Sequence, residues 1–311
     1  MGNAEDIALF TWHRRQAGFG WVRSRAVTIA HPQDFLVPLD DSRPRPVTFY
    51  EPLVEERALF RQFGECEPTK AGILAFANQF GELGADRAML SGRSGPVQWG
   101  DSISTWIQAI VKMRNAVDVW DAITADDYGL LREWFRVQQP EPPILGGAIF
   151  ERDGGFHNFV SEREELWEHV QGADTQNPAE LVRIARFFLQ KSTNVGLKDA
   201  SPRLLFNPAT DSHELHIVPR NLLGAMWMQF SRAFEGNKGY RRCQQCKQWI
   251  EVSTEGHRSH TVYCGDTCRV RAHRAKKAKA RRLAADGVPI REVARRLNTT
   301  AKAVRGWIKA G

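Results

Sequence analysis

The 311-residue sequence contains no apolar run close to the roughly 20 residues that a membrane-spanning helix needs. It also lacks the motifs of several common active sites: a Walker loop, G-x-S-x-G, H-E-x-x-H and a dinucleotide fingerprint. Near two glycines, Glu151, Asp153 and His157 form a loose polar grouping of the kind that arises by chance in loops. We therefore expect a cytoplasmic protein that does not contact the membrane and is not an enzyme.

Cysteine is scarce, with five residues in the whole chain. Cys66 stands alone, whereas the other four form C-x2-C at Cys243 and Cys246, then seventeen residues, then C-x3-C at Cys264 and Cys268. In a reducing cytosol, clustered cysteines hold metal or do redox chemistry more often than they form disulfides. A thioredoxin-like site would need one C-x-x-C on a βαβ unit, which the sequence lacks.

Two close cysteine pairs separated by a short loop are typical of tetrahedral Zn2+. Four protein ligands leave no open coordination position, so we expect one structural Zn2+ held by Cys243, Cys246, Cys264 and Cys268. His257 and His260 lie in the loop and could replace a ligand. Residues 249–253 and 260–264 are expected to form a hairpin. Asp266 or Thr267 is then expected to cap a helix that carries Cys268 in its first turn.

Acidic residues are scarce in the last quarter of the chain. From residue 240 onward there are 18 of the 43 Lys and Arg residues but only 5 of the 36 Asp and Glu residues, a formal charge of +13. The preceding 239 residues carry −6. Such asymmetry indicates a polyanionic partner for the carboxy-terminal part and a different role for the acidic body.

Residues 269–282 contain eight Lys or Arg among fourteen residues and no acidic residue. Ala, Lys and Arg are strong helix formers, so one continuous helix is expected. Its charges would repel one another unless phosphates neutralised them; the alternative is a solvated basic helix. The candidate nucleic-acid contacts here are Arg269, Arg271, Arg274, Lys276, Lys277, Lys279, Arg281 and Arg282.

Two short amphipathic helices are predicted after Gly287 and Pro289. The first has apolar residues at Ile290, Val293, Ala294 and Leu297, and the second at Val304, Trp307 and Ile308. Thr300 is a candidate N-cap for the second helix. This pattern predicts a helix-turn-helix, with Ala301 and three basic residues directed outward. The candidate contacts with DNA are Thr300, Lys302, Arg305 and Lys309.

The zinc segment resembles the CGNR-type zinc finger of bacterial regulators. The shared features are a basic residue before the first C-x2-C, the strand Trp249-Ile250, Ser253, and Tyr263-Cys264 before the C-x3-C. Only Arg271 matches the Gly-Asn-Arg that follows the last cysteine in that family. The resemblance covers about 40 residues and implies a treble-clef finger, a nucleic-acid-binding regulatory role, and zinc ligation by the four cysteines. The last 30 residues resemble the helix-turn-helix segments of regulators and recombinases.

The body, residues 1–239, is expected to be mainly helical with a few strands. Helical periodicity covers residues 51–63, 68–83, 101–123, 126–137, 178–190 and 221–234. Strands are expected over 20–30 and 47–50, and a hairpin over 203–218. The Pro- and Gly-rich segment near residue 140 is a candidate division between two lobes. We expect a mainly α (α+β) chain: body 1–239, four-cysteine zinc finger 240–275, and basic helix with helix-turn-helix 276–311.

These observations favour a zinc-containing, sequence-specific protein that binds double-stranded DNA, a nucleoid-associated bacterial transcriptional regulator. The body would sense a small-molecule effector or mediate homodimer formation, because one short recognition helix reads few base pairs. Two alternatives remain open at this point. The protein could be an enzyme or effector acting on nucleic acid with the tail as tether, or an RNA-binding or protein-interaction module.

Overall fold

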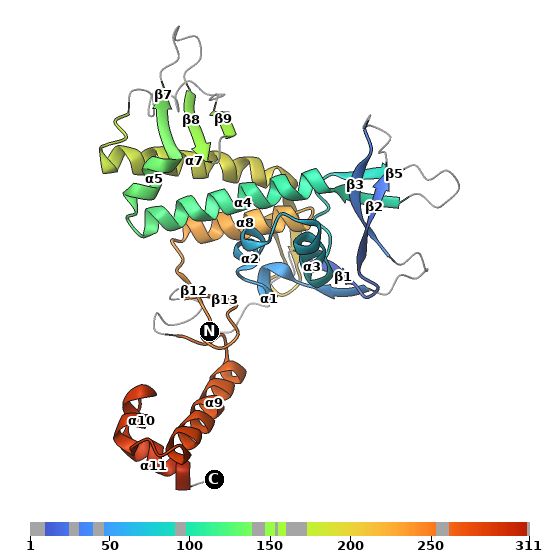
Figure 1. Cartoon of the computed structure of the whole chain (residues 1–311). Helices are drawn as coiled ribbons and strands as arrows, with labels where there is room; N and C mark the ends of the chain where they lie inside the picture. The colour runs from blue at the N-terminus through green and yellow to red at the C-terminus, as the bar shows by residue number, and fades with distance from the viewer. Residues whose placement is uncertain are drawn as a thin grey trace. The chain divides into compact units, whose positions relative to one another are not determined.

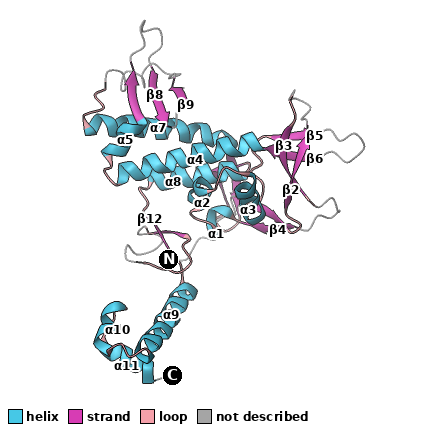
Figure 2. Cartoon of the chain, viewed as in Figure 1, coloured by secondary structure: helices cyan, strands magenta, loops and turns pink. Residues whose placement is uncertain are grey.

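The computed structural model describes residues 10–24, 31–39, 47–90, 98–138, 147–152, 155–159, 173–252 and 261–309. The chain divides into two compact units, Met1–Asn237 and Lys238–Gly311 (Figure 1). Each unit combines helices with small antiparallel sheets, as expected for a mixed α+β class (Figure 2). The expected boundary at residues 275–276 lies inside one continuous helix. The division expected near residue 140 lies outside the described residues.

Helices form the centre of the first unit, and several begin at a side-chain cap. Thr69, Ser102, Asp127 and Asn221 each accept a hydrogen bond from a backbone N–H in the first turn of the helix that follows. The helices are α1 (Pro52–Glu55), α2 (Leu59–Glu65), α3 (Lys70–Phe80), α4 (Ile103–Thr124), α5 (Tyr128–Trp134), α7 (Pro178–Gly196), the 3-10 turn η1 (Leu197–Asp199) and α8 (Leu222–Glu235).

The core of the first unit is rich in aromatic side chains. Trp106, Trp134, Phe60 and Phe230 are fully buried. The Phe230 ring lies edge-to-face with Phe60 and with Trp120, with ring centroids 5.7 Å apart in each pair. Such pairs add to the stabilisation that burial of the rings already provides. The apolar helix α8 therefore contributes to this core.

Antiparallel sheets flank these helices. A four-stranded sheet has the order β2-β3-β6-β5, and β1 pairs with β4. Strands β7, β8 and β9 form a three-stranded sheet, and β10 pairs with β11. The strands are β1 (Trp12–Arg15), β2 (Phe19–Ser24), β3 (Gln33–Pro38), β4 (Val47–Tyr50), β5 (Arg87–Leu90), β6 (Gln98–Ser102), β7 (Phe135–Gln138), β8 (Gly147–Arg152), β9 (Gly155–Phe159), β10 (Ala200–Asn207) and β11 (Ser212–Pro219).

Two helical predictions for the first unit were too long. The helix expected over 51–63 is interrupted between α1 and α2, where Glu56 and Ala58 leave helical geometry. The helix expected over 126–137 ends at Trp134, because Phe135–Gln138 pairs with β8. Seven strands of this unit, β1, β3, β5, β6, β7, β8 and β9, were not predicted. The buried run Phe35, Leu36 and Val37 of β3 lacks the alternation that identifies a half-exposed strand.

The second unit contains a short hairpin and three helices. The hairpin is β12 (Tyr240–Arg242) with β13 (Trp249–Glu251). The helices are α9 (Asp266–Ala285), α10 (Ile290–Arg296) and α11 (Ala301–Lys309). Two small cores hold the unit together: one is centred on Cys243, Ile250 and Cys268, and the other lies among the three helices.

Candidate metal centre and basic surface

The four predicted cysteines come together at one point of the second unit. Their sulfur atoms all lie within 4.8 Å of one another. Cys264 Sγ lies 3.6 Å from Cys246 Sγ and 3.4 Å from Cys268 Sγ. Four sulfurs placed about 2.3 Å from one tetrahedral ion would be about 3.8 Å apart, so this set fits a four-coordinate metal. Cys66 lies in the other unit, and burial raises its pKa to about 11.

The hairpin β12–β13 positions the first cysteine pair. The Cys243 N–H donates to Gln248 O at 2.8 Å, and the Lys247 N–H donates to Cys243 O at 3.0 Å. Lys247 takes a left-handed conformation, φ 65°, which closes the tight turn around the pair. The strand at 249–251 therefore pairs with the segment before the first cysteine. The expected pairing with residues 260–264 is wrong for the described part of that segment, 261–264, which is not a strand.

The second pair is held by a helix start. Gly265 is the N-cap of α9, so the expected capping by Asp266 or Thr267 is wrong; Asp266 instead lies in the first turn. Cys268 also lies in that first turn, as predicted. Gln244 N–H donates to Val262 O at 2.9 Å and so ties the two pairs together. His257 and His260, the alternative ligands, lie outside the described residues.

The surroundings of the cysteines favour a thiolate at Cys243 but oppose one at Cys264. Burial opposes ionisation of Cys243, but backbone N–H groups of Cys246, Cys264 and Gln245 outweigh burial and lower its pKa to about 6. Burial and the three neighbouring sulfurs raise the pKa of Cys264. A divalent cation among the sulfurs would offset this repulsion, because it stabilises coordinated thiolates. The donor set therefore fits a soft or borderline metal ion with no open position.

The three helices beyond the cysteines pack around one small core. Ala280 of α9, Val293, Ala294 and Leu297 of the α10 region and Val304 of α11 are buried together. Asn298 takes a left-handed conformation, φ 44°, in the turn between α10 and α11. Thr300 Oγ1 then accepts from the Ala303 N–H at 3.1 Å, which is the predicted N-cap contact. The sequence predicted that Ala301 faces outward and that Ile308 lies on the apolar face. Both predictions were wrong, because Ala301 packs against the core and Ile308 is 36% exposed.

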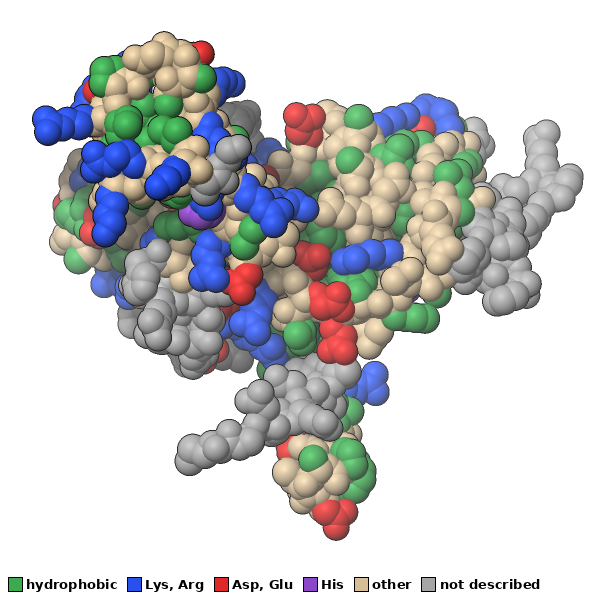
Figure 3. All heavy atoms as spheres, turned by 90° about the horizontal axis from the view of Figure 1, so that it is seen from below, with side chains coloured by type: hydrophobic (Ala, Val, Ile, Leu, Met, Phe, Trp, Pro, Cys, Tyr) green, Lys and Arg blue, Asp and Glu red, His purple; other side chains and the backbone are tan. Residues whose placement is uncertain are grey.

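Basic side chains cover the outside of these helices. On α11, Lys302, Arg305 and Lys309 are exposed at intervals of three and four residues, opposite the buried Val304. On α9, Arg271, Arg274 and Arg282 are exposed on the side away from the buried Ala280. Lys279 is also exposed, and Lys277 is half-buried. Lys and Arg side chains gather in the upper left of the space-filling view, among few acidic ones (Figure 3).

Three of the candidate contacts have partners inside the protein. Lys276 Nζ donates to Asn298 O at 3.1 Å, and Arg281 Nε donates to Trp307 O at 2.8 Å. Arg269 forms an ion pair with Asp266 at 3.0 Å. Lys276 and Arg281 therefore connect α9 to the ends of α10 and α11, a role that sequence reasoning missed. Their positive charge suits these sites because carbonyls at helix ends lack intrahelical partners.

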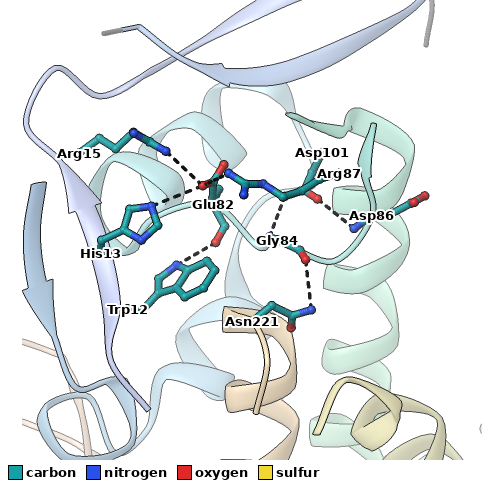
Figure 4. Close-up of polar contacts among 9 residues, drawn as sticks. All are labelled: Trp12, His13, Arg15, Glu82, Gly84, Asp86, Arg87, Asp101 and Asn221. Atoms are coloured by element: carbon teal, nitrogen blue, oxygen red, sulfur yellow. Dashed lines mark hydrogen bonds and ion pairs between the residues drawn. The ribbon is translucent and has the colours of Figure 1, made fainter. Parts of the chain in front are cut away.

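A second polar cluster lies in the first unit (Figure 4). Glu82 is 1% exposed and faces His13, Arg15 and Arg87. Burial alone would raise its pKa, but the hydrogen bond from His13 and the charge of Arg87 lower it to about 2. Gly84 and Asp86 donate backbone N–H groups to Asp101, and Asn221 donates to Gly84 O. These contacts connect β1, β5, β6 and α8, so the cluster holds these elements together.

No family model, curated protein or solved structure matches this chain. Support for the likeness to a CGNR-type finger comes from the four-cysteine cluster in the structure. The structure defines a protein in which four clustered cysteines that could hold a metal ion precede a basic three-helix segment. Among the described residues, no helix is both long and apolar enough to cross a membrane.

Proposed function

We propose that this protein is a bacterial transcriptional regulator that binds double-stranded DNA through its second unit. One structural Zn2+ held by Cys243, Cys246, Cys264 and Cys268 would order the β12–β13 hairpin and the start of α9. Helices α10 and α11 would act as a helix-turn-helix, with α11 as the recognition helix in the major groove.

One observation carries this proposal: the exposed face of α11 is basic and its opposite face is buried. Val304 is 0% exposed, whereas Lys302, Arg305 and Lys309 face solvent. Arg and Lys side chains on a recognition helix can donate to guanine O6 and N7 in the major groove. The tight turn at Asn298 and the capping Thr300 set the start of α11, where such a helix first meets the base edges.

The basic face of α9 would have a different task. Arg271, Arg274 and Arg282 face away from the shared core, so they would contact phosphates rather than base edges. Phosphate contacts set affinity and its dependence on salt, but they carry no sequence information. The structural roles of Lys276 and Arg281 set them apart from these residues.

The experiment is enrichment of genomic duplex fragments by the full-length protein at about 0.15 M salt, where non-specific attraction is partly screened. A short motif shared by the recovered fragments is the expected result. Uniform recovery would contradict sequence reading, and stronger binding to single-stranded RNA at equal salt would indicate an RNA-binding protein instead.

Two matched double variants then separate the basic faces. Lys302→Ala with Arg305→Ala should lose about 1–3 kcal/mol of discrimination for each base contact removed. Arg271→Ala with Arg274→Ala should weaken binding to all sequences alike and reduce the salt slope by about 2. If both pairs affected binding equally, the docking of α11 in the groove would be wrong.

A further inference from the structure

A strand pair on a protein surface normally directs its polar side chains to solvent. In the β10–β11 ribbon of the first unit, the apolar side chains face solvent instead. The pairing register places Pro202 opposite Ile217, Leu204 opposite Leu215, and Phe206 opposite His213. Because side chains alternate between the two faces of a strand, these six residues share one face of the ribbon. That face is largely apolar and contains no Lys, Arg, Asp or Glu.

The apolar face is the exposed one. The exposed fractions are 65% for Leu204, 52% for Phe206, 72% for Leu215 and 56% for Ile217. On the other face, Glu214 accepts from Asn207 Nδ2 at 2.8 Å and contacts His216 Nε2 at 3.0 Å. Polar groups on this face are therefore paired with one another, while the large apolar side chains of the opposite face are more than half exposed.

Such an arrangement is costly for a single chain. The ribbon packs on α8 and η1, and among the described residues no further strand pairs with β10 or β11. Together the four side chains present on the order of 500 Å2 of apolar surface, the size of the largest apolar patch on a typical monomer. Patches of this size commonly mark an interaction site.

We propose that the occupant of this face is a second copy of the same chain, packed face to face through β10 and β11. Two copies would bury about 1,000 Å2 in total, the lower limit for a specific interface. The face suits packing against a copy of itself, because the central pair Leu204–Leu215 lies between the Pro202–Ile217 pair on one side and Phe206 with His213 on the other. Its lack of charged residues means that stacking two copies desolvates no ion.

This inference rests on the proposed function, since a regulator with one short recognition helix per chain gains its site size from two-fold symmetry. The partner surface lies in the first unit, however, so it can be measured without DNA. A dimer that fails to form would refute the interface and leave the DNA-binding proposal standing. A dimer that forms but binds no DNA sequence would support the interface and refute only that proposal.

The first measurement is the mass of the full-length protein by sedimentation at micromolar concentrations. The expected mass is that of two chains, and Leu204→Ser with Leu215→Ser should reduce it to one. A matched control is Met89→Ser with Trp99→Ser, because these residues are another exposed cross-strand apolar pair, 39% and 47% exposed. The control should remain a dimer. A monomeric wild type, or equal loss of the dimer in both variants, would overturn the proposal.

Charge complementation tests whether the same face is used on both copies. Leu215→Glu and Leu215→Lys should each be monomeric, because every dimer would bring like charges into an apolar interface. Mixing the two variants should restore dimers that contain one chain of each. Both substitutions are at a side chain that is 72% exposed, so the first unit should keep its thermal unfolding midpoint. Failure of the mixture to associate would show that the face meets something other than itself.

Discussion

The two units of this chain are stabilised in different ways. In the first unit, large aromatic side chains such as Trp106, Phe60 and Phe230 are fully buried. In the second unit, the buried side chains are smaller and none is aromatic: Ala280, Val293, Ala294, Leu297 and Val304 in the helical core, and Cys243, Ile250 and Cys268 in the cysteine cluster. Buried apolar area grows with side-chain size, so the aromatic core contributes most of the hydrophobic stabilisation of the first unit. The second unit buries less apolar area, so we expect a metal ion at the four cysteines to contribute to its stability.

The largest expected effect is the response of the second unit to metal loss. Removing Zn2+ with a chelator, or the substitution Cys243→Ser, should unfold the β12–β13 hairpin and the start of α9. In such sites the free energy of metal binding, on the order of 10 kcal/mol, stabilises the folded state. Hydrogen exchange at residues 240–252 and 261–270 should then become fast, while the first unit stays protected.

Cys66→Ser is the matched control for metal loss, since Cys66 lies in the first unit. It should retain one metal ion per chain by elemental analysis. Full metal content in Cys243→Ser, together with unchanged exchange of the hairpin amides, would refute the four-thiolate site.

The reverse experiment targets the aromatic core. Phe230→Ala should lower the free energy of unfolding of the first unit by about 3–5 kcal/mol, because it opens a cavity between Phe60 and Trp120. Denaturant unfolding measures this loss. Phe49→Ala should change it little, since Phe49 is 65% exposed. If Phe230→Ala also released the metal, the two units would not be independent.

Acid should affect the first unit through Glu82. Its pKa is lowered to about 2 in the folded protein, so its stabilisation is fully present above its ordinary value near 4.5. That stabilisation, on the order of 3 kcal/mol, should be lost as the pH falls from about 4.5 toward 2. Denaturant midpoints measured across this range should fall.

Glu82→Gln isolates this contribution. The variant should be less stable at neutral pH, because Arg15 and Arg87 lose their buried counter-charge. It should also lack most of the acid-dependent loss. Burial raises the pKa of Asp101, so protonation of Asp101 at low pH favours the folded state. Asp101 is present in both proteins, so it affects both pH curves alike. Parallel pH curves for wild type and Glu82→Gln would show that Glu82 is not the controlling group.

The same contrast explains what could be predicted from sequence. Cysteine spacing predicted that these four residues come together, because two close cysteine pairs at these intervals are typical of a metal site. Helices α3, α4, α7 and α8 were predicted because their caps and apolar periodicity are local signals. Strands β3 and β6 pair across a long sequence separation. Strands β5 and β6 are neighbours in the chain, but they are too short to carry a clear periodicity.

Charge alone did not reveal the task of each basic residue. The sequence treats the eight Lys and Arg residues of 269–282 alike, yet Lys276 and Arg281 hold carbonyls of the neighbouring helices. Those partners follow from how α9 packs against α10 and α11, which no local pattern encodes. The polar cluster around Glu82 was missed for the same reason, because its residues are far apart in the sequence, from His13 to Asn221.

The smallest expected effect distinguishes these two kinds of basic residue. Arg281→Ala should destabilise the end of α11 by about 1 kcal/mol, because the carbonyl of Trp307 loses a charged donor. Arg282→Ala is the neighbouring control, since its exposed side chain makes no hydrogen bond that the structure records among the described residues. Hydrogen exchange of the α11 amides should accelerate several-fold in the first variant and stay unchanged in the second. Equal acceleration in both would mean that general charge, rather than the contact with Trp307, stabilises α11.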